Sequence, residues 1–170
     1  AGSQFSAMRS TTFRTGPGDL WAAVTAPDRL VRWIGTWTWD PSTGRVRFRM
    51  TAEGADAPED DLEIRECTPP TRLAVHSEDA SGVWDIWLDL AASELDGTVT
   101  LTFTHVVHDV SSVETVGPGW DYYLDRLVAA QAGADVDAVD FDSYYPALCA
   151  HYAALAAHMT TPTGRGVAGR

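Results

Sequence analysis

Two histidines late in the chain have a spacing that can bind metal. His105 and His108 read H-x-x-H, which can hold a metal when both side chains lie on one face of a helix. Here they end a segment in which apolar residues alternate with threonine, so a strand is predicted and residues three apart point to opposite faces. No cysteine or carboxylate completes a ligand set, and we expect no metal. His105 is expected near an apolar strand face and His108 in solvent.

The acidic segment 135–142 is a candidate for calcium. An EF-hand loop needs glycine at its sixth position and a bidentate carboxylate at its twelfth. Counting from Asp135, those positions hold Asp140 and Pro146, so the EF-hand is excluded. We predict a solvated acidic linker here. The acidic segment 52–61 is predicted to be a second exposed connection without metal.

Nucleophilic catalysis lacks a recognisable set of residues. Cys149 and His151 lie two positions apart, and such residues do not face each other on a helix. The chain has no G-x-S-x-G, P-loop, G-x-G-x-x-G or C-x-x-C motif, and no cofactor is predicted. The weak acid–base candidates that remain are Glu66, His105, Asp121 and, on an outer strand face, His76.

The chain has seven tryptophans, and their placement is the most informative feature. Trp37, Trp39 and Trp87 do not fit one inward face, whereas other aromatic residues follow the apolar faces of predicted strands and helices. Each ring alone can be explained by core packing. Together they predict a cavity for a flat or lipid-like apolar ligand. The predicted cavity residues are Trp33, Trp84, Phe103, His105, Trp120, Tyr123 and Leu124.

Length and composition indicate one folded domain. The chain has 170 residues, of which 45% are hydrophobic and 21% charged. The net charge of −12 opposes binding to nucleic acid or to an anionic membrane surface, and no apolar run is long enough for a membrane span. All basic residues are arginine, which is typical of a GC-rich bacterial genome. Cys67 and Cys149 are predicted to be buried free thiols in a reducing cytoplasm.

Local patterns predict a strand, two short helices, a meander of about five strands and two more helices. The first strand covers 9–15, and the short helices cover 19–25 and 27–33. The strands follow from two-residue alternation after Gly35, with Asp96-Gly97 as a hairpin turn. A capping box at 111–114 opens a long helix to Ala132, which Pro118 kinks or delays to Trp120. The last helix covers 141–158.

This order requires a sheet with one apolar face and a single long helix to cover it. One straight helix cannot cover a wide twisted sheet, so the sheet must curl and leave a pocket. The fold class is therefore α+β. Residues 1–7 are set apart as a tag or disordered N-terminus, 8–133 as the domain, 134–158 as a helical extension and 159–170 as a disordered tail. An apolar stripe on the extension is expected to pack on the domain or form a homodimer.

Several motifs in order carry a resemblance to a known family. They are Leu20 to Pro27, Leu30 to Gly35, Glu66 with Pro69-Pro70 and Arg72-Leu73, Gly97 to His105, and Gly119-Trp120 with Leu124 to Leu127. The chain resembles the START-like (SRPBCC) superfamily, and within it the activator of heat-shock-protein-90 ATPase homologues. The resemblance implies a helix-grip fold, in which a curved antiparallel sheet wraps around a long C-terminal helix, with two short helices after the first strand.

Three functions remain open from the sequence. The first is a non-enzymatic cavity protein that binds a small hydrophobic ligand. The second is an enzyme of the polyketide cyclase or aromatase kind, which shares this fold and uses one or two polar residues. The third is a stress- or chaperone-linked interaction module, with Trp37, Trp39 and Trp87 as its docking patch.

Overall fold

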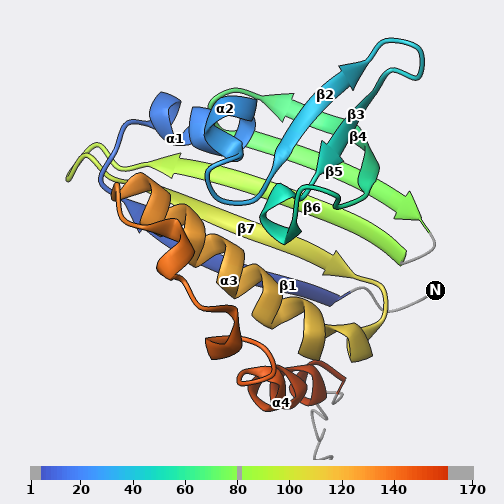
Figure 1. The fold of residues 1–170 in the computed structure, drawn as a ribbon. Helices are drawn as coiled ribbons and strands as arrows, with labels where there is room; N and C mark the ends of the chain where they lie inside the picture. Colours follow the sequence, from blue (N-terminus) through green and yellow to red (C-terminus); the bar gives the residue numbers. More distant parts are fainter. Residues whose placement is uncertain (1–4, 80–81, 161–170) are drawn as a thin grey trace, which may run out of the picture.

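Seven strands form one curved antiparallel sheet in the order β1-β7-β6-β5-β4-β3-β2 (Figure 1). The computed structural model describes residues 5–79 and 82–160. The strands are β1 (Phe5–Phe13), β2 (Thr36–Asp40), β3 (Arg45–Arg49), β4 (Glu59–Thr68), β5 (Arg72–Asp79), β6 (Gly82–Ala92) and β7 (Val99–Val107). β1 pairs with β7 rather than with a sequence neighbour, so the first strand closes the sheet beside the last.

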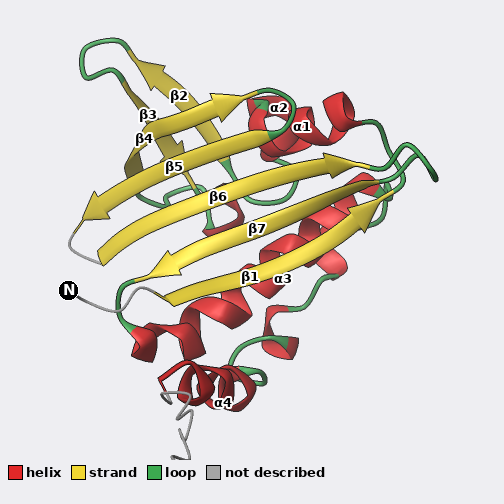
Figure 2. Ribbon diagram, turned by 180° about the vertical axis from the view of Figure 1, so that it is seen from behind, coloured by secondary structure: helices red, strands yellow, loops and turns green. Residues whose placement is uncertain are grey.

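The helices cover one face of this sheet, and Figure 2 shows the opposite face without a helix. The long helix α3 crosses the concave face, while α1 and α2 lie over its other end (Figure 1). α4 lies beyond α3 and packs on it rather than on the middle of the sheet. The helices are α1 (Pro17–Thr25), α2 (Pro27–Leu30), α3 (Val113–Gln131) and α4 (Cys149–Thr160), with 3-10 turns η1 (Thr51–Glu53), η2 (Val110–Ser112), η3 (Val136–Ala138) and η4 (Phe141–Ser143).

The alternation in β7 explains how the sheet and α3 meet. Leu101 and Phe103 are buried in a core cluster with Leu124 and Leu127 of α3. The apolar side chains of β7 face the helix because successive residues of a strand point to opposite faces. The α+β fold predicted from the order of elements and the helix-grip architecture implied by the family resemblance are therefore confirmed.

The α1–α2 region completes the core. Leu20 of α1 is fully buried, and Trp33 after α2 donates its indole N–H to the carbonyl of Ala23 at 2.9 Å. Gly35 then brings the chain against β3. A Cβ at this glycine would lie 2.1 Å from the carbonyl oxygen of Arg49, so only glycine permits the approach.

α3 starts close to the opening predicted at 111–114, but the alternative of a start delayed to Trp120 by Pro118 is wrong. The helix begins at Val113 and continues through Pro118, which is fully buried within it. Proline removes one backbone donor, but burial of the ring and of the neighbouring side chains offsets that loss. The predicted capping box is also wrong. Asp109 caps the preceding turn η2 by accepting from the N–H of Ser111, and Ser112 makes no side-chain cap bond.

The C-terminal helix is shorter than predicted. η4 covers Phe141–Ser143, and α4 begins only at Cys149. Pro146 explains the interruption, because it lacks an N–H and disfavours helical backbone in the residue before it. The tail predicted to be disordered covers 159–170. Met159 and Thr160 belong to α4, and residues 161–170 lie outside the described part of the chain.

Two further differences concern the edges of the domain. β1 begins at Phe5, so the sheet takes in part of the segment set apart as 1–7. β2 and β3 form a hairpin, which gives one strand more than the expected meander. Cys67 and Cys149 are both free, but Cys67 is exposed and Cys149 is half-buried, so neither is fully buried as predicted. β4 carries a bulge between Ile64 and Glu66, which breaks the strict alternation there.

Candidate functional site: an aromatic cluster and an adjoining groove

Five of the predicted cavity residues form a continuous aromatic cluster between α3 and the sheet. Trp84 of β6 stacks on His105 of β7, with ring centroids 4.9 Å apart. Trp120 of α3 contacts His105 edge-on at 6.3 Å and Phe103 at 4.4 Å. Tyr123 contacts Trp120 at 6.2 Å. We use the name aromatic cluster for Trp84, Phe103, His105, Trp120 and Tyr123.

The other two predicted residues lie in the packed core. Leu124 is on the sheet-facing side of α3, one position after the cluster residue Tyr123. Trp33 is buried beneath α1 and α2, and its indole N–H is already bonded to Ala23. Leu124 therefore lies beside the cluster, whereas Trp33 packs at the other end of the core.

The hydrogen bond between Trp120 and His105 fixes which imidazole nitrogen carries the proton. Trp120 donates its indole N–H to Nδ1 of His105 at 3.3 Å, and an indole nitrogen can only donate. Burial lowers the pKa of His105 to about 4, opposed in part by the charge of Asp85. The ring is therefore neutral at pH 7, with its proton on Nε2.

Nε2 of His105 is a buried donor without a partner among the described residues. The residue is only 3% exposed, so bulk solvent does not satisfy this N–H. A buried donor without a partner destabilises the folded state by about 1–3 kcal/mol. Such donors are rare in folded proteins, so this one points to a function. The cluster thus offers flat apolar surface together with one hydrogen-bond donor.

Tyr123 links the cluster to the connection between β3 and β4. Its hydroxyl donates to Oε1 of Glu53 in η1 at 3.0 Å. Burial, and then the charge of Glu53, raises the pKa of Tyr123, so the hydroxyl keeps its proton. This bond ties η1 to α3 across the edge of the cluster.

The remaining acid–base candidates do not join the cluster. Glu66 is exposed on β4 and forms an ion pair with Arg72 at 3.2 Å. Asp121 is held by Arg9 and by the hydroxyl of Tyr152. His105 is thus the one candidate that the fold places among the predicted cavity residues. His76 lies on the other face of the sheet, as predicted, where it contacts Asp85 at 2.7 Å.

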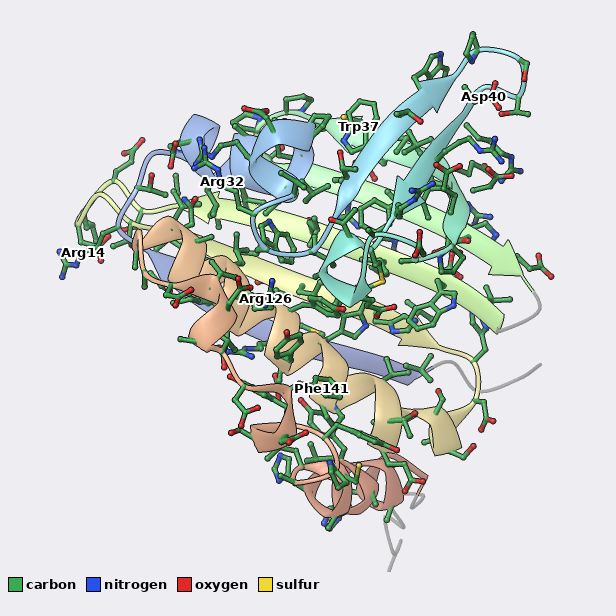
Figure 3. All side chains as sticks on the ribbon, viewed as in Figure 1. Arg14, Arg32, Trp37, Asp40, Arg126 and Phe141 are labelled. Carbon is green, nitrogen blue, oxygen red and sulfur yellow. The ribbon has the colours of Figure 1, made fainter. Side chains whose placement is uncertain are left out.

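The three tryptophans of the predicted docking patch do not share a surface. Trp37 packs against the core and donates to the carbonyl of Thr25 at 2.7 Å (Figure 3). Trp39, on the same strand, is exposed towards the tip of the β2–β3 hairpin. Trp87 lies on the convex face of β6, in register with Thr104, with the guanidinium of Arg72 over its ring.

Two buried or half-buried arginines hold α3 in place. Arg9 of β1 binds the carboxylates of Asp121 and Asp125, which also accept from Tyr152 and Tyr144 at 2.7 and 2.6 Å. These bonds join the C-terminal segment to the sheet through α3. On the other side of α3, Arg126 donates to the carbonyl of Trp33 at 2.9 Å (Figure 3).

A groove of about 710 Å³ lies beside the aromatic cluster, between β1, α3 and α4. Its walls are Met8 and Arg9 of β1, one side of α3, and a face of α4. Phe103 and Trp120 border both the groove and the cluster. The sequence interpretation missed this groove because it placed no residue of the extension in a binding site. The i, i+4, i+7 spacing of His151, Leu155 and His158 was the available signal.

No evidence for a metal site or a membrane-spanning helix is found in the described residues. Across 5–79 and 82–160, no group of three histidine, cysteine or acidic side chains could hold a metal ion. None of the helices in those ranges is long and apolar enough to cross a membrane.

The curved sheet closed around α3 defines a START-like helix-grip protein. The chain belongs to the family described as Activator of Hsp90 ATPase homolog 1-like protein, whose model matches residues 14–132. The match ends just after α3, so the whole of β1 and the extension that carries α4 lie outside it. No curated protein matches the sequence.

Solved structures of bacterial proteins share the fold. CalU16 from Micromonospora echinospora is 20% identical, with a TM-score of 0.66 over 92% of this chain and 98% of that one. EF2215 from Enterococcus faecalis, a conserved protein of unknown function, is 17% identical, with a TM-score of 0.69 over 93% and 88% of the two chains. DynU16 is 19% identical, with a TM-score of 0.63 over 77% of this chain and 49% of its own. At these identities the likeness establishes the fold alone.

Proposed function

We propose that this protein is a non-enzymatic, cytoplasmic binder of a small hydrophobic molecule that carries a hydrogen-bond acceptor. The proposed binding site is the concave face of the sheet beside α3, lined by the aromatic cluster and Leu124, with Trp33 deeper in the core. The family and fold support a ligand-binding role. The chemical class of the ligand follows from the side chains present, which are flat aromatic rings and one donor.

The observation that carries this proposal is the unpaired Nε2–H of His105. Buried donors without a partner are rare in protein interiors, because each one lowers the stability of the folded state. A ligand carbonyl or ether oxygen at Nε2 would remove that cost, and stacking on Trp84 or Trp120 would bury its rings. Such a ligand would replace some of the contacts that the rings now make with one another.

A matched pair of probes tests the proposal. Fluorenone and fluorene have the same three-ring skeleton, but only fluorenone carries a carbonyl acceptor. Titration of each is followed by quenching of tryptophan fluorescence. We expect fluorenone to bind about fivefold more tightly, which corresponds to about 1 kcal/mol for one neutral hydrogen bond.

The control variant is His105→Phe, which keeps a flat ring against Trp84 and removes both nitrogens. In this variant the two probes should bind with equal Kd. Equal binding to the natural protein, or a preference for fluorenone that survives in the variant, would contradict the role of His105. Native mass spectrometry of the purified protein provides an independent search for a retained natural ligand.

A second candidate is an enzyme of the polyketide cyclase or aromatase kind. DynU16, which shares this fold, is a protein of the dynemicin biosynthetic locus. Of the three weak catalytic candidates, only His105 lies in the cluster, where a neutral imidazole N–H can polarise a carbonyl group. Incubation with a linear poly-β-ketone thioester discriminates the two functions. Loss of water on ring closure, absent in His105→Phe, would support the enzyme.

A further inference from the structure

The groove between β1, α3 and α4 has the size and shape of a small-molecule site. Its volume of about 710 Å³ falls within the range of about 300–1,000 Å³ that is usual for ligand pockets. Its lining comes from four elements, β1, β7, α3 and α4, so it is not a depression on one helix. Its lining includes Phe103 and Trp120, which are also members of the aromatic cluster.

Large apolar side chains face this groove without being covered by the protein. Leu155 on α4 is 43% exposed, and Met8 on β1 is 68% exposed. Both belong to its lining, together with Val113 of α3. A ligand that covers these side chains gains the free energy of removing apolar surface from water. The groove is therefore suited to an apolar molecule.

The charged groups of the groove are already paired with one another. Arg9 donates to the backbone carbonyl and to Oδ1 of Asp121, each at 2.9 Å, and also binds Asp125. Oδ2 of Asp121 accepts from the hydroxyl of Tyr152 at 2.7 Å. An anionic ligand would have to displace a carboxylate from Arg9 in a protein of net charge −12. This arrangement favours an uncharged ligand.

The close packing of α4 on α3 shapes the groove. Gly117 of α3 lies under the ring of Tyr152, and a Cβ there would come within 2.3 Å of that ring. The absence of a side chain therefore allows α4 to approach α3 at this point. The walls formed by α4 and by Met8 and Arg9 lie outside residues 14–132, which the family model matches.

We infer that this groove is a second binding site, for an uncharged apolar molecule the size of a small ring system, with the imidazoles of His151 and His158 at its border. The site does not depend on the proposed function, because it is formed by α4 and β1 rather than by the donor of His105. Its ligand is held by Met8, Leu155 and Trp120 on the three walls.

Two dyes of matched skeleton test the site. N-phenyl-1-naphthylamine is uncharged, and 8-anilino-1-naphthalenesulfonate adds a sulfonate to the same rings. The fluorescence of each rises in an apolar environment, which gives a direct titration on the full chain. We expect the uncharged dye to bind at least about tenfold more tightly, since burying an unpaired charge is costly. Tighter binding of the sulfonate would overturn the inference.

Substitutions on two walls locate the dye. Leu155→Glu should raise the Kd of the uncharged dye about tenfold by placing a charge against it. Ala154→Glu is the matched control, because Ala154 is exposed on the same helix and outside the groove lining, and its Kd should not change. Met8→Glu places the charge on β1 and should repeat the effect of Leu155→Glu without altering α4.

The outcomes separate this site from the proposed one. His105→Phe should leave the Kd of the uncharged dye unchanged while it removes the preference for fluorenone. The proposed groove site would be refuted by an unchanged Kd in both Leu155→Glu and Met8→Glu. An equal loss of dye affinity in Ala154→Glu would also refute it. Melting curves and circular dichroism of each variant show that α4 remains folded and that a loss of binding is local.

Discussion

Acidification from pH 7 to pH 5 should destabilise the fold through His105. Burial lowers the pKa of His105 from 6.5 to about 4 in the folded protein, because the charged ring would lose its hydration. Between these two values the unfolded chain binds a proton that the folded chain does not. Stability therefore rises with pH in this window and falls as the pH drops from about 6.5 towards 4.

The size of the effect follows from the two pKa values. Over the whole window the free energy of unfolding falls by roughly 3 kcal/mol, at about 1.4 kcal/mol for each tenfold change in proton affinity. Between pH 7 and pH 5 the free energy of unfolding is expected to fall by roughly 2 kcal/mol. The ring is only 3% exposed and stacks on Trp84, so solvent does not screen the charge that protonation would create.

Urea denaturation at pH 7, 6 and 5 measures this contribution. The natural protein and His105→Phe share every other titratable group, including Asp85 and His108, whose charges act on His105. The difference between their pH profiles therefore isolates residue 105. Parallel profiles would refute the assignment of a neutral, buried imidazole, and with it the assignment of the Nε2 proton as a free donor.

Three further substitutions test how the site is supported, each measured by urea denaturation. Tyr152→Phe removes the bond to Asp121 and should cost about 1 kcal/mol, with faster proteolysis of the segment after residue 140; unchanged proteolysis would contradict a role in holding α4. Arg126→Met leaves the carbonyl of Trp33 without its donor and should cost about 2 kcal/mol, whereas a neutral result would mean that solvent replaces the guanidinium. Gly35→Ala places a Cβ 2.1 Å from the Arg49 carbonyl and should cost about 3 kcal/mol or more; a stable variant would show that β3 can shift.

The aromatic cluster shows what residue spacing can predict about the position of a side chain. Trp84, Phe103 and His105 each lie on the apolar side of the alternation in their own strand. Trp120 and Tyr123 are three positions apart on a helix, so a shared space was predictable. Trp33 fits the same apolar pattern but packs beneath α1 and α2. A pattern identifies the face on which a side chain lies, but it does not determine which part of the core that face meets.

The C-terminal extension shows the opposite case. Its apolar stripe was recognised, but Pro146 delays α4 until Cys149, so the extension is not one continuous helix. The ion pairs of Arg9 with Asp121 and Asp125 join residues more than one hundred positions apart. No local pattern indicates such a pair, because any of the many acidic residues could have been the partner.

The sequence by itself determined the order of the elements, the inward face of each strand and the family, because these depend on residue spacing within short segments. Tertiary structure decided which imidazole nitrogen of His105 is left without a partner, since that depends on Trp120 reaching across from α3. It also decided that α4 and β1 enclose a groove. Both features arise from contacts between distant segments, whose relative position is set by packing of the whole core.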